Sequence, residues 1–392
     1  MPRDITNSYL LSLARSSLRG ENVENAPQGV DFSRLLNLAH YHGLVELIAY
    51  SVPKIEPSVD EQIASTFERL RRTGIAKSVN QEIELEALCG KFVEQSVDYL
   101  LLKGSVLKDF YPTPDMRSMC DIDILVREKD MSAVDKIMQE LGYTEKQESD
   151  HDVSYKKPPY VNIEIHYSLT QYDFGRKAYE HFKDIWSLAK QKEGKPNAYE
   201  LPAEELYIYH IDHMSKHYAL GGCGTRPFCD IFVFLKAHPS LNWEYISDTL
   251  EKIALKDFEA HARALALKWF DNGEGDEVSD AIEDYILTGG GFGTKEREKI
   301  SLILRKGTKK KRVSRARLLL YKLFLPYRHM KVVYPSLKKV PFLLPFYWIV
   351  RIFRTLIFRR GKISENLNVD KQQEQINALA EHFSTVGLAL RE

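Results

Sequence analysis

Between residues 97 and 169 the chain changes from helical spacing to short apolar runs of strand length, and this change limits the folds it can adopt. Residues 1–97 show the apolar spacing of helices, and helical patterns return after Gly175. The runs that predict strands are 97–104, 120–126, 151–157 and 160–169. A chain with this alternation is not a pure helix bundle. We predict an α+β fold, a mixed sheet with N- and C-terminal helical regions.

The length and the pattern changes together predict several folding regions. A chain of 392 residues suits two or three domains, and 44% hydrophobic residues suffice for a substantial core. The predicted regions are a helical region at 1–97, a core with strands at 98–175, a helical domain at 176–290 and a basic amphipathic region at 291–392. Within the helical parts, 58–97 fits one long helix or two abutting helices, and 244–270 is expected to be helical.

The net charge of zero conceals an uneven distribution of charge. Residues 305–362 contain 18 Lys and Arg and no Asp or Glu, whereas the first 304 residues contain 35 basic and 50 acidic side chains. This asymmetry predicts an anionic partner for the basic segment. The chain shows no recognisable nucleic-acid module, so RNA binding by the basic run 309–317 is the least favoured reading.

The segment 341–360 predicts an amphipathic helix with arginines on one stripe. Arg351, Arg354 and Arg359 share that stripe, and apolar residues around Trp348 fill the rest of the helix. Two arginines and a proline interrupt the apolar run, so it should not span a bilayer. Two alternatives remain open: binding of 305–362 to an anionic membrane surface, and packing of this helix on the acidic body.

The cysteines and the N-terminal residues indicate in which cellular compartment the protein is expected. The four cysteines form neither a CxxC pair nor a zinc-binding spacing, which favours a reducing environment. The first twenty residues lack a clean apolar run, so no signal peptide is expected. We therefore expect a cytoplasmic protein, located peripherally at the inner face of the membrane if the basic segment binds lipid.

A pair of carboxylates in the predicted strand 120–126 is the main candidate for chemistry. Asp121 and Asp123 are two positions apart on a strand, so their side chains point to the same face. Two carboxylates on one rigid face repel each other unless a cation lies between them, which is the arrangement of a divalent metal site. Glu164, between two isoleucines of a later strand, is the candidate third ligand, and a buried structural ion pair is its alternative.

Upstream of the acidic pair, Gly104 and Ser105 follow a predicted strand and precede a predicted helix. Backbone N–H groups at such a junction can hold a phosphate, and glycine allows close approach of the ligand. A strand–Gly–Ser–helix segment, an Asp-x-Asp pair and a later acidic residue form the layout of a two-metal phosphoryl or nucleotidyl transfer site.

Several neighbouring residues have two open interpretations. Lys103 either faces water at a strand end or contacts a triphosphate. Arg117 either forms an ion pair with the acidic cluster or binds phosphate. His166, on the same strand face as Glu164, either orients an acidic residue, acts as a base or is a core histidine. Lys216 and His217, on a predicted helix with His210 and His213, either contact the acceptor or pack between helices.

These motifs make the chain resemble the nucleotidyltransferase superfamily, whose fold is shared with DNA polymerase beta. More narrowly it is similar to bacterial nucleotidyltransferase-like proteins often encoded among cell-surface polysaccharide genes. The residues that carry the resemblance are Lys103-Gly104-Ser105, Tyr111, Arg117, Asp121 to Val126, Glu164-Ile165-His166, His210, Lys216-His217, Arg226 and Asp230. The resemblance covers most of residues 30–240. Fifteen residues separate Ser105 from Asp121, which is longer than the usual superfamily spacing.

The resemblance implies a transferase that moves a nucleoside monophosphate from an NTP, with ATP expected, to an acceptor hydroxyl or phosphate. It implies Mg²⁺ or Mn²⁺ held by Asp121, Asp123 and Glu164, and a role in surface polysaccharide metabolism. The implied nucleotide-binding residues are Lys103, Gly104, Ser105, Arg117, His166, Lys216 and His217. Two alternatives remain open: an antitoxin-like nucleotidyltransferase that modifies a protein or tRNA, and a catalytically degenerate nucleotide-binding scaffold at the membrane.

Overall fold

The computed structural model divides the chain into two compact units, one formed by 1–294 with 385–392 and the other by 295–384. The residues that it describes are 4–56, 58–149, 151–159, 161–170, 175–290, 293–306, 324, 327, 330, 333–338, 340–358 and 369–388. The four regions expected from the sequence are finer than this division and stay a prediction.

The first unit combines a mixed sheet with α-helices before and after it. The helices before the sheet are α1 (Ile5–Arg19), α2 (Phe32–His42), α3 (Val45–Ile48) and α4 (Glu61–Glu94). Within the sheet region lie α5 (Gly104–Leu107), the short helices η2 (Lys108–Phe110) and η3 (Pro114–Met116), α6 (Met131–Glu140), α7 (Arg176–Phe182) and α8 (Ile185–Leu188). The later helices are α9 (Ala203–Ala219), α10 (Arg226–Ala237), α11 (Trp243–Lys252), α12 (Lys256–Phe270) and α13 (Glu277–Gly289).

The sheet has seven strands in the order β3-β4-β5-β2-β1-β7-β6. Their bounds are β1 (Tyr99–Leu101), β2 (Ile122–Val126), β3 (Glu145–Glu148), β4 (Asp152–Lys157), β5 (Val161–His166), β6 (Lys190–Gln191) and β7 (Ala198–Glu200). The central strand β2 pairs in parallel with β5 and antiparallel with β1. The sheet is therefore mixed, as the sequence predicts for an α+β fold.

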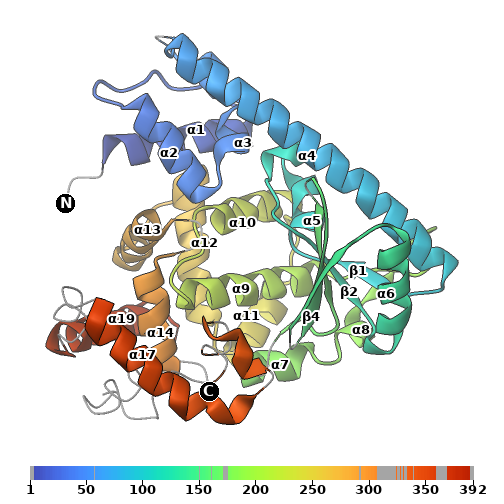
Figure 1. Ribbon diagram of the computed structural model, residues 1–392. Coiled ribbons are helices and arrows are strands. Elements are labelled where there is room, and N and C mark those ends of the chain that lie inside the picture. Colours follow the sequence, from blue (N-terminus) through green and yellow to red (C-terminus); the bar gives the residue numbers. More distant parts are fainter. Residues whose placement is uncertain are drawn as a thin grey trace. The chain divides into compact units, whose positions relative to one another are not determined.

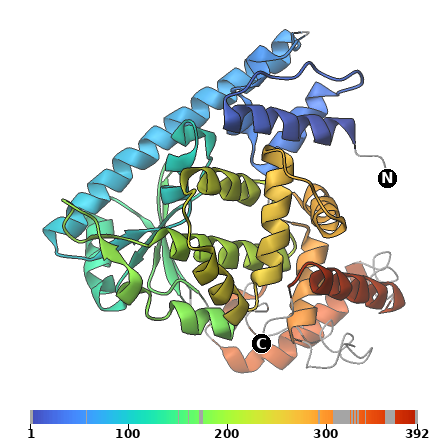
Figure 2. The same ribbon diagram turned by 180° about the vertical axis from the view of Figure 1, so that it is seen from behind.

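One face of the sheet is apolar and forms the core under α4 and α6. Every second residue of β2 belongs to this core: Ile122, Ile124 and Val126. The helices contribute Leu88, Phe92, Val134, Ile137 and Met138. Figures 1 and 2 show α4 and α6 on this side of the sheet, with α9 and α10 on the other. The period of two along the strands therefore directs the remaining side chains toward α9.

The prediction of an α+β fold is confirmed, with local differences. The stretch 58–97 forms the single helix α4, of 34 residues. The expected helix at 244–270 is two helices, because the chain leaves helical geometry at Ala254, whose φ is 59°. The short strands β3, β6 and β7 are not among the predicted strands. Their sequences are mostly polar, so periodicity gives little signal for them.

The described part of the second unit contains α14 (Lys295–Lys306), α17 (Leu344–Phe358) and α19 (Val369–Thr385), with short helices η6 (Pro335–Lys338) and η7 (Pro341–Leu343). The predicted helix within 341–360 is thus present. The basic run 309–317, Arg359 and the side chain of Arg354 lie outside what the structure describes. Among the described residues, no helix combines the length and hydrophobicity needed to cross a bilayer.

Candidate active site

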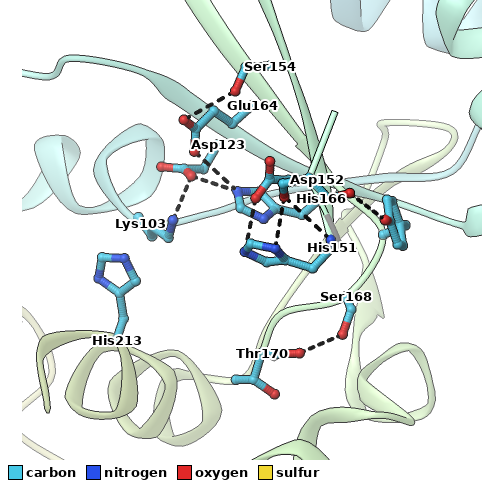
Figure 3. Close-up of polar contacts among 12 residues, drawn as sticks. Lys103, Asp123, His151, Asp152, Ser154, Glu164, His166, Ser168, Thr170 and His213 are labelled. Carbon is cyan, nitrogen blue, oxygen red and sulfur yellow. Dashed lines mark hydrogen bonds and ion pairs between the residues drawn. The ribbon is translucent and has the colours of Figure 1, made fainter. Parts of the chain in front are cut away.

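The acidic residues predicted from the sequence lie on the face of the sheet opposite the apolar core. Asp121 immediately precedes β2, and Asp123 lies inside it between two core isoleucines. The parallel pairing of β2 with β5 places Asp123 directly beside Glu164. Ser154 of β4 lies opposite Glu164 on the next strand, with its hydroxyl 3.5 Å from the Glu164 carboxylate. Three adjacent strands therefore present polar side chains on one surface, as Figure 3 shows.

Asp123 is the buried centre of this group. Its Oδ1 accepts hydrogen bonds from Lys103 Nζ at 2.6 Å and from His166 Nε2 at 2.8 Å. Burial would raise the pKa of this carboxyl, but Lys103 and His166 outweigh that effect and hold the pKa well below its usual range. Asp123 is therefore ionised. Lys103 points to the acidic cluster rather than to water, and Asp123 likewise raises the pKa of Lys103 despite its burial.

Glu164 and Asp121 are in a less favourable charge environment. Burial, and then the negative charges of Asp121 and Asp123, raise the pKa of Glu164 to about 7. Burial and Asp123 also raise the pKa of Asp121. Lys103 is the nearby cation that stabilises Asp123, and it does not compensate the other two carboxylates fully. The cluster therefore has unbalanced negative charge.

The carboxylates of this cluster suit a hard divalent cation such as Mg²⁺ or Mn²⁺. Ligand atoms of Asp123, Glu164 and His166 all lie within 4.8 Å of one another. Carboxylate oxygens are the preferred ligands of these ions, and a bound cation would relieve the repulsion between Glu164 and its neighbours. Asp121 is not a member of this close set, although its charge acts on Glu164.

The turn after β1 is sharp, and the helix that follows it is shorter than the sequence predicts. Lys103 has a φ of 46°, an unusual value for a residue with a side chain, and it turns the chain from β1 into α5. The helix α5 is a single turn of four residues followed by a 3₁₀ turn. Ser105 is buried, and its hydroxyl has no hydrogen-bond partner among the described residues.

Gly104 is close to protein atoms. A Cβ at this position would lie 2.3 Å from Arg117 Nη1 and 2.7 Å from the sulfur of Met119. The absence of a side chain at residue 104 therefore makes room for Arg117 and Met119. Its role in admitting a ligand remains a prediction.

Arg117 forms an ion pair with Asp230 instead of the acidic cluster on the sheet. Its Nε and Nη2 donate to the two oxygens of Asp230 at 2.7 and 2.8 Å, and both side chains are buried. The Tyr111 hydroxyl donates to the same carboxylate at 2.8 Å. Arg226, four residues before Asp230, donates to the Ser118 carbonyl. These contacts attach the loop between β1 and β2 to α10. Arg117 therefore forms an ion pair, but its partner is Asp230 and not the acidic cluster expected from the sequence.

Helix α9 faces the acidic surface with an aromatic and two histidine side chains. Burial lowers the pKa of His213 well below its usual value, and the Lys103 ammonium adds to the effect. Tyr209 is buried, and its hydroxyl has no hydrogen-bond partner among the described residues. His217 Nε2 lies 3.1 Å from His213 Nε2, next to Lys216 in the chain. Figure 3 shows His213 turned toward Lys103. His210 bonds to the Pro227 carbonyl.

Sequence reasoning did not assign Tyr209, His151 or Asp152 to the site. For Asp152 the signal was the two-residue period of 151–157, which places Asp152 and Ser154 on the same face as Glu164, but its use depends on knowing which strand lies beside β5. From the sequence, His213 was recognised only as one of several histidines on the same predicted helix. Its proximity to Lys103 arises from the packing of α9 on the sheet.

Comparisons with known proteins identify the family of this chain. A family model described as an uncharacterised nucleotidyltransferase matches residues 28–271, more than half of the 392-residue chain. Neither a search of curated proteins nor a search of solved structures gave a match. The matched range contains β1, β2 and β5 with all the acidic residues described above. The chain therefore belongs to this family of nucleotidyltransferases.

Proposed function

We propose that the protein is a metal-dependent enzyme that transfers a nucleoside monophosphate from an NTP to an acceptor hydroxyl or phosphate. The observation that carries this proposal is the parallel register of β2 and β5, which sets Asp123 beside Glu164 and near Asp121. Family membership supports the same reaction class. In the reaction, an acceptor oxygen forms a bond to the α-phosphorus of the NTP, the bond to the β-phosphate oxygen breaks, and pyrophosphate leaves.

Asp121, Asp123 and Glu164 would hold Mg²⁺ or Mn²⁺. When bound, such ions supply positive charge that stabilises the reacting phosphate oxygens. His166 is a positioning residue, since its Nε2 fixes the Asp123 carboxylate at 2.8 Å. Lys103 supplies a fixed positive charge next to the carboxylates. Gly104 and Ser105 are the proposed seat of the triphosphate, and the Ser105 hydroxyl, which has no hydrogen-bond partner in the described part of the chain, is the proposed donor to it.

The acceptor side of the site is proposed to involve Lys216 and His217, on the α9 helix that faces the acidic surface. His217 is exposed, so it can reach a bound acceptor. Arg117 is the remaining proposed nucleotide ligand, although its contacts to Asp230 already use the N–H of Nε and one N–H of Nη2. We propose ATP as donor and a surface polysaccharide intermediate as acceptor, with protein or tRNA modification as the alternative.

Peripheral binding to an anionic membrane surface is proposed for the basic segment 305–362. Phe342, Phe346 and Ile349 are 80%, 57% and 54% exposed and recur at helical spacing. Exposed apolar side chains within a segment whose sequence is rich in Lys and Arg suit the interface of an anionic bilayer. This binding would place a cytoplasmic enzyme at the inner face of the membrane.

A labelling assay tests the proposed reaction. The full chain is incubated with each α-labelled NTP, Mg²⁺ or Mn²⁺ and cell-lysate fractions, and label transfer and pyrophosphate release are measured. Transfer should require the metal and be lost in Glu164→Gln. A labelled small molecule identifies a metabolic acceptor, whereas a labelled protein or RNA identifies the antitoxin-like alternative. If folded wild-type protein with metal neither transfers label nor releases pyrophosphate, the proposal is wrong and the catalytically degenerate scaffold is favoured.

A further inference from the structure

A second cluster of potential metal ligands lies at the end of β4 and β5, next to the carboxylates. It comprises His151, Asp152 and His166, whose ligand atoms all lie within 4.8 Å of one another. Asp152 is directly opposite His166 in the antiparallel pairing of the two strands. His151 Nε2 lies 2.9 Å from Asp152 Oδ2, and the rings of His151 and His166 are 5.8 Å apart. Figure 3 shows the three side chains facing one another.

His166 supplies an independent sign that a ligand belongs in this cluster. The residue is 3% exposed, and its Nε2 is bonded to Asp123. Its other nitrogen, Nδ1, is buried and has no hydrogen-bond partner among the described residues. Buried imidazole nitrogens normally have a partner, because leaving one without a bond costs free energy.

The contact between His166 and Asp123 is of the kind that orients a metal-binding histidine. A histidine that binds a metal through one nitrogen almost always donates the N–H of the other to a carboxylate or carbonyl. Asp123 accepts from Nε2 at 2.8 Å and so favours the tautomer in which Nδ1 carries a lone pair. The lone pair of Nδ1 is then available to a cation.

We propose that His151, Asp152 and His166 bind Zn²⁺, with the fourth coordination position open to water or a substrate oxygen. Two imidazoles and one carboxylate are a zinc donor set, and the three protein ligands with an open position are typical of zinc sites that contact substrate. Mg²⁺ prefers oxygen ligands alone, so it belongs to the adjacent carboxylates. His166 therefore connects two metal sites of different chemistry through its two nitrogens.

An ordinary surface ion pair is the alternative, and the chain contains a matched example. His261 Nδ1 lies 3.4 Å from Asp276 Oδ2, also in a partly exposed setting. No second histidine joins that pair among the metal-binding groups of the described residues. His261→Gln is therefore a control for the loss of a histidine–aspartate pair without the loss of a metal ligand.

The test measures metal binding by the full chain, freed of metal and then kept in excess Mg²⁺. Equilibrium dialysis measures Zn²⁺ binding, and Co²⁺ reports coordination by its visible absorption. Wild type should bind one Zn²⁺ per chain and give the intense bands of a four-coordinate Co²⁺ site. Loss of a residue that only hydrogen-bonds to a metal ligand costs about 10–100-fold in metal affinity. His151→Gln and Asp152→Asn remove the ligands themselves, so each should cost at least about 100-fold. His261→Gln should bind as wild type does.

Three results would overturn the proposal: no Zn²⁺ bound by wild type in excess Mg²⁺, wild-type affinity in both His151→Gln and Asp152→Asn, or loss of Zn²⁺ in Glu164→Gln with retention in His151→Gln. The last result would place the ion among the carboxylates instead. Circular dichroism confirms that each variant is folded. Because the readout is binding, it is independent of whether nucleotidyl transfer occurs.

Discussion

Asp123 and Glu164 are direct neighbours across β2 and β5, yet their charge environments are opposite. Lys103 and His166 stabilise the ionised form of Asp123, whereas burial and two nearby carboxylates destabilise the ionised form of Glu164. Both residues are proposed metal ligands, so both should be needed for activity. Their contributions to the stability of the metal-free protein should have opposite signs.

Glu164→Gln should stabilise the metal-free protein while abolishing transfer. The change removes a buried carboxylate that Asp121 and Asp123 repel, and the pKa raised to about 7, first by burial and then by these two charges, reflects the combined cost of ionising Glu164. One pKa unit is worth about 1.4 kcal/mol, so the free energy of unfolding should rise by roughly 1–3 kcal/mol. Denaturant unfolding in chelator measures it. A variant less stable than wild type would show that Glu164 forms a favourable structural ion pair.

Asp123→Asn should abolish transfer and also destabilise the fold. It leaves the buried Lys103 ammonium without the carboxylate 2.6 Å away, and loss of one partner of a buried pair costs about 3–5 kcal/mol. The same unfolding measurement should show this loss. The double variant Asp123→Asn with Lys103→Met should recover part of the lost stability, because it leaves no buried charge without its partner. Without such recovery, the contact is not a coupled ion pair.

Gly104→Ala should destabilise the protein through Arg117 and Met119. The added methyl group would lie within 3 Å of both side chains, and overpacking of this kind costs about 1–3 kcal/mol. A Cβ at Gly90 in α4 would meet nothing within 4 Å, so Gly90→Ala is the matched control and should be stabilising by about 0.5–1 kcal/mol. The melting temperatures of the two variants, each compared with wild type, test this prediction. Equal behaviour would mean that the space beside Gly104 is free for a ligand.

At the scale of an element, helix α2 ends on a histidine that should make stability depend on pH. His42 is 1% exposed, neither ring nitrogen has a hydrogen-bond partner among the described residues, and burial lowers its pKa to about 4. In the unfolded chain its pKa is about 6.5. The unfolded state therefore binds more protons between these values, so stability is full above about 6.5 and falls as the pH drops toward 4.

His42→Phe should remove this pH dependence. The lowered pKa corresponds to roughly 3 kcal/mol of stability that wild type loses between the two pKa values and the variant keeps. The measurement is the difference in unfolding free energy between neutral pH and the acid end of this range. His40→Gln, two residues earlier at an exposed position of the same helix, should behave as wild type does. An equal acid loss in all three proteins would rule out His42 as its source.

At the scale of the whole molecule, the uneven charge and the exposed apolar side chains of the second unit predict two separable components of membrane binding. The positive charge of 305–362 should give binding to anionic vesicles that falls as salt is added. Phe346→Ser with Ile349→Ser should weaken the part that survives high salt, since both side chains are more than half exposed. The sequence favoured Trp348 as the centre of the apolar face, but its ring makes an edge-to-face contact with Phe324.

Co-sedimentation with vesicles tests both components. The triple variant Arg351→Glu, Arg354→Glu and Arg359→Glu should remove the salt-sensitive component of vesicle binding. Ile83→Ser, which changes an exposed residue of α4 in the first unit, should leave binding unchanged. Wild-type protein that stays in the supernatant with anionic vesicles at low salt would favour packing of the basic helix on protein.

The sequence alone determined the fold class and the direction of the key side chains. In a strand, alternate residues point to opposite faces, so Asp121 and Asp123 share a face as soon as 120–126 is assigned as a strand. The same rule places Glu164 and His166 together on β5. These inferences are local, because they depend only on the covalent geometry of a few consecutive residues.

The tertiary structure decided which of these residues meet. Strand neighbours depend on the packing of the whole chain, so the pairing of β2 with β5, and with it the Asp123–Glu164 contact, cannot be read from either strand. Arg117 was expected near the carboxylates four residues away, but its partner is Asp230, 113 residues later. A buried guanidinium needs a buried carboxylate, and only the packing of α10 on the β1–β2 loop supplies one.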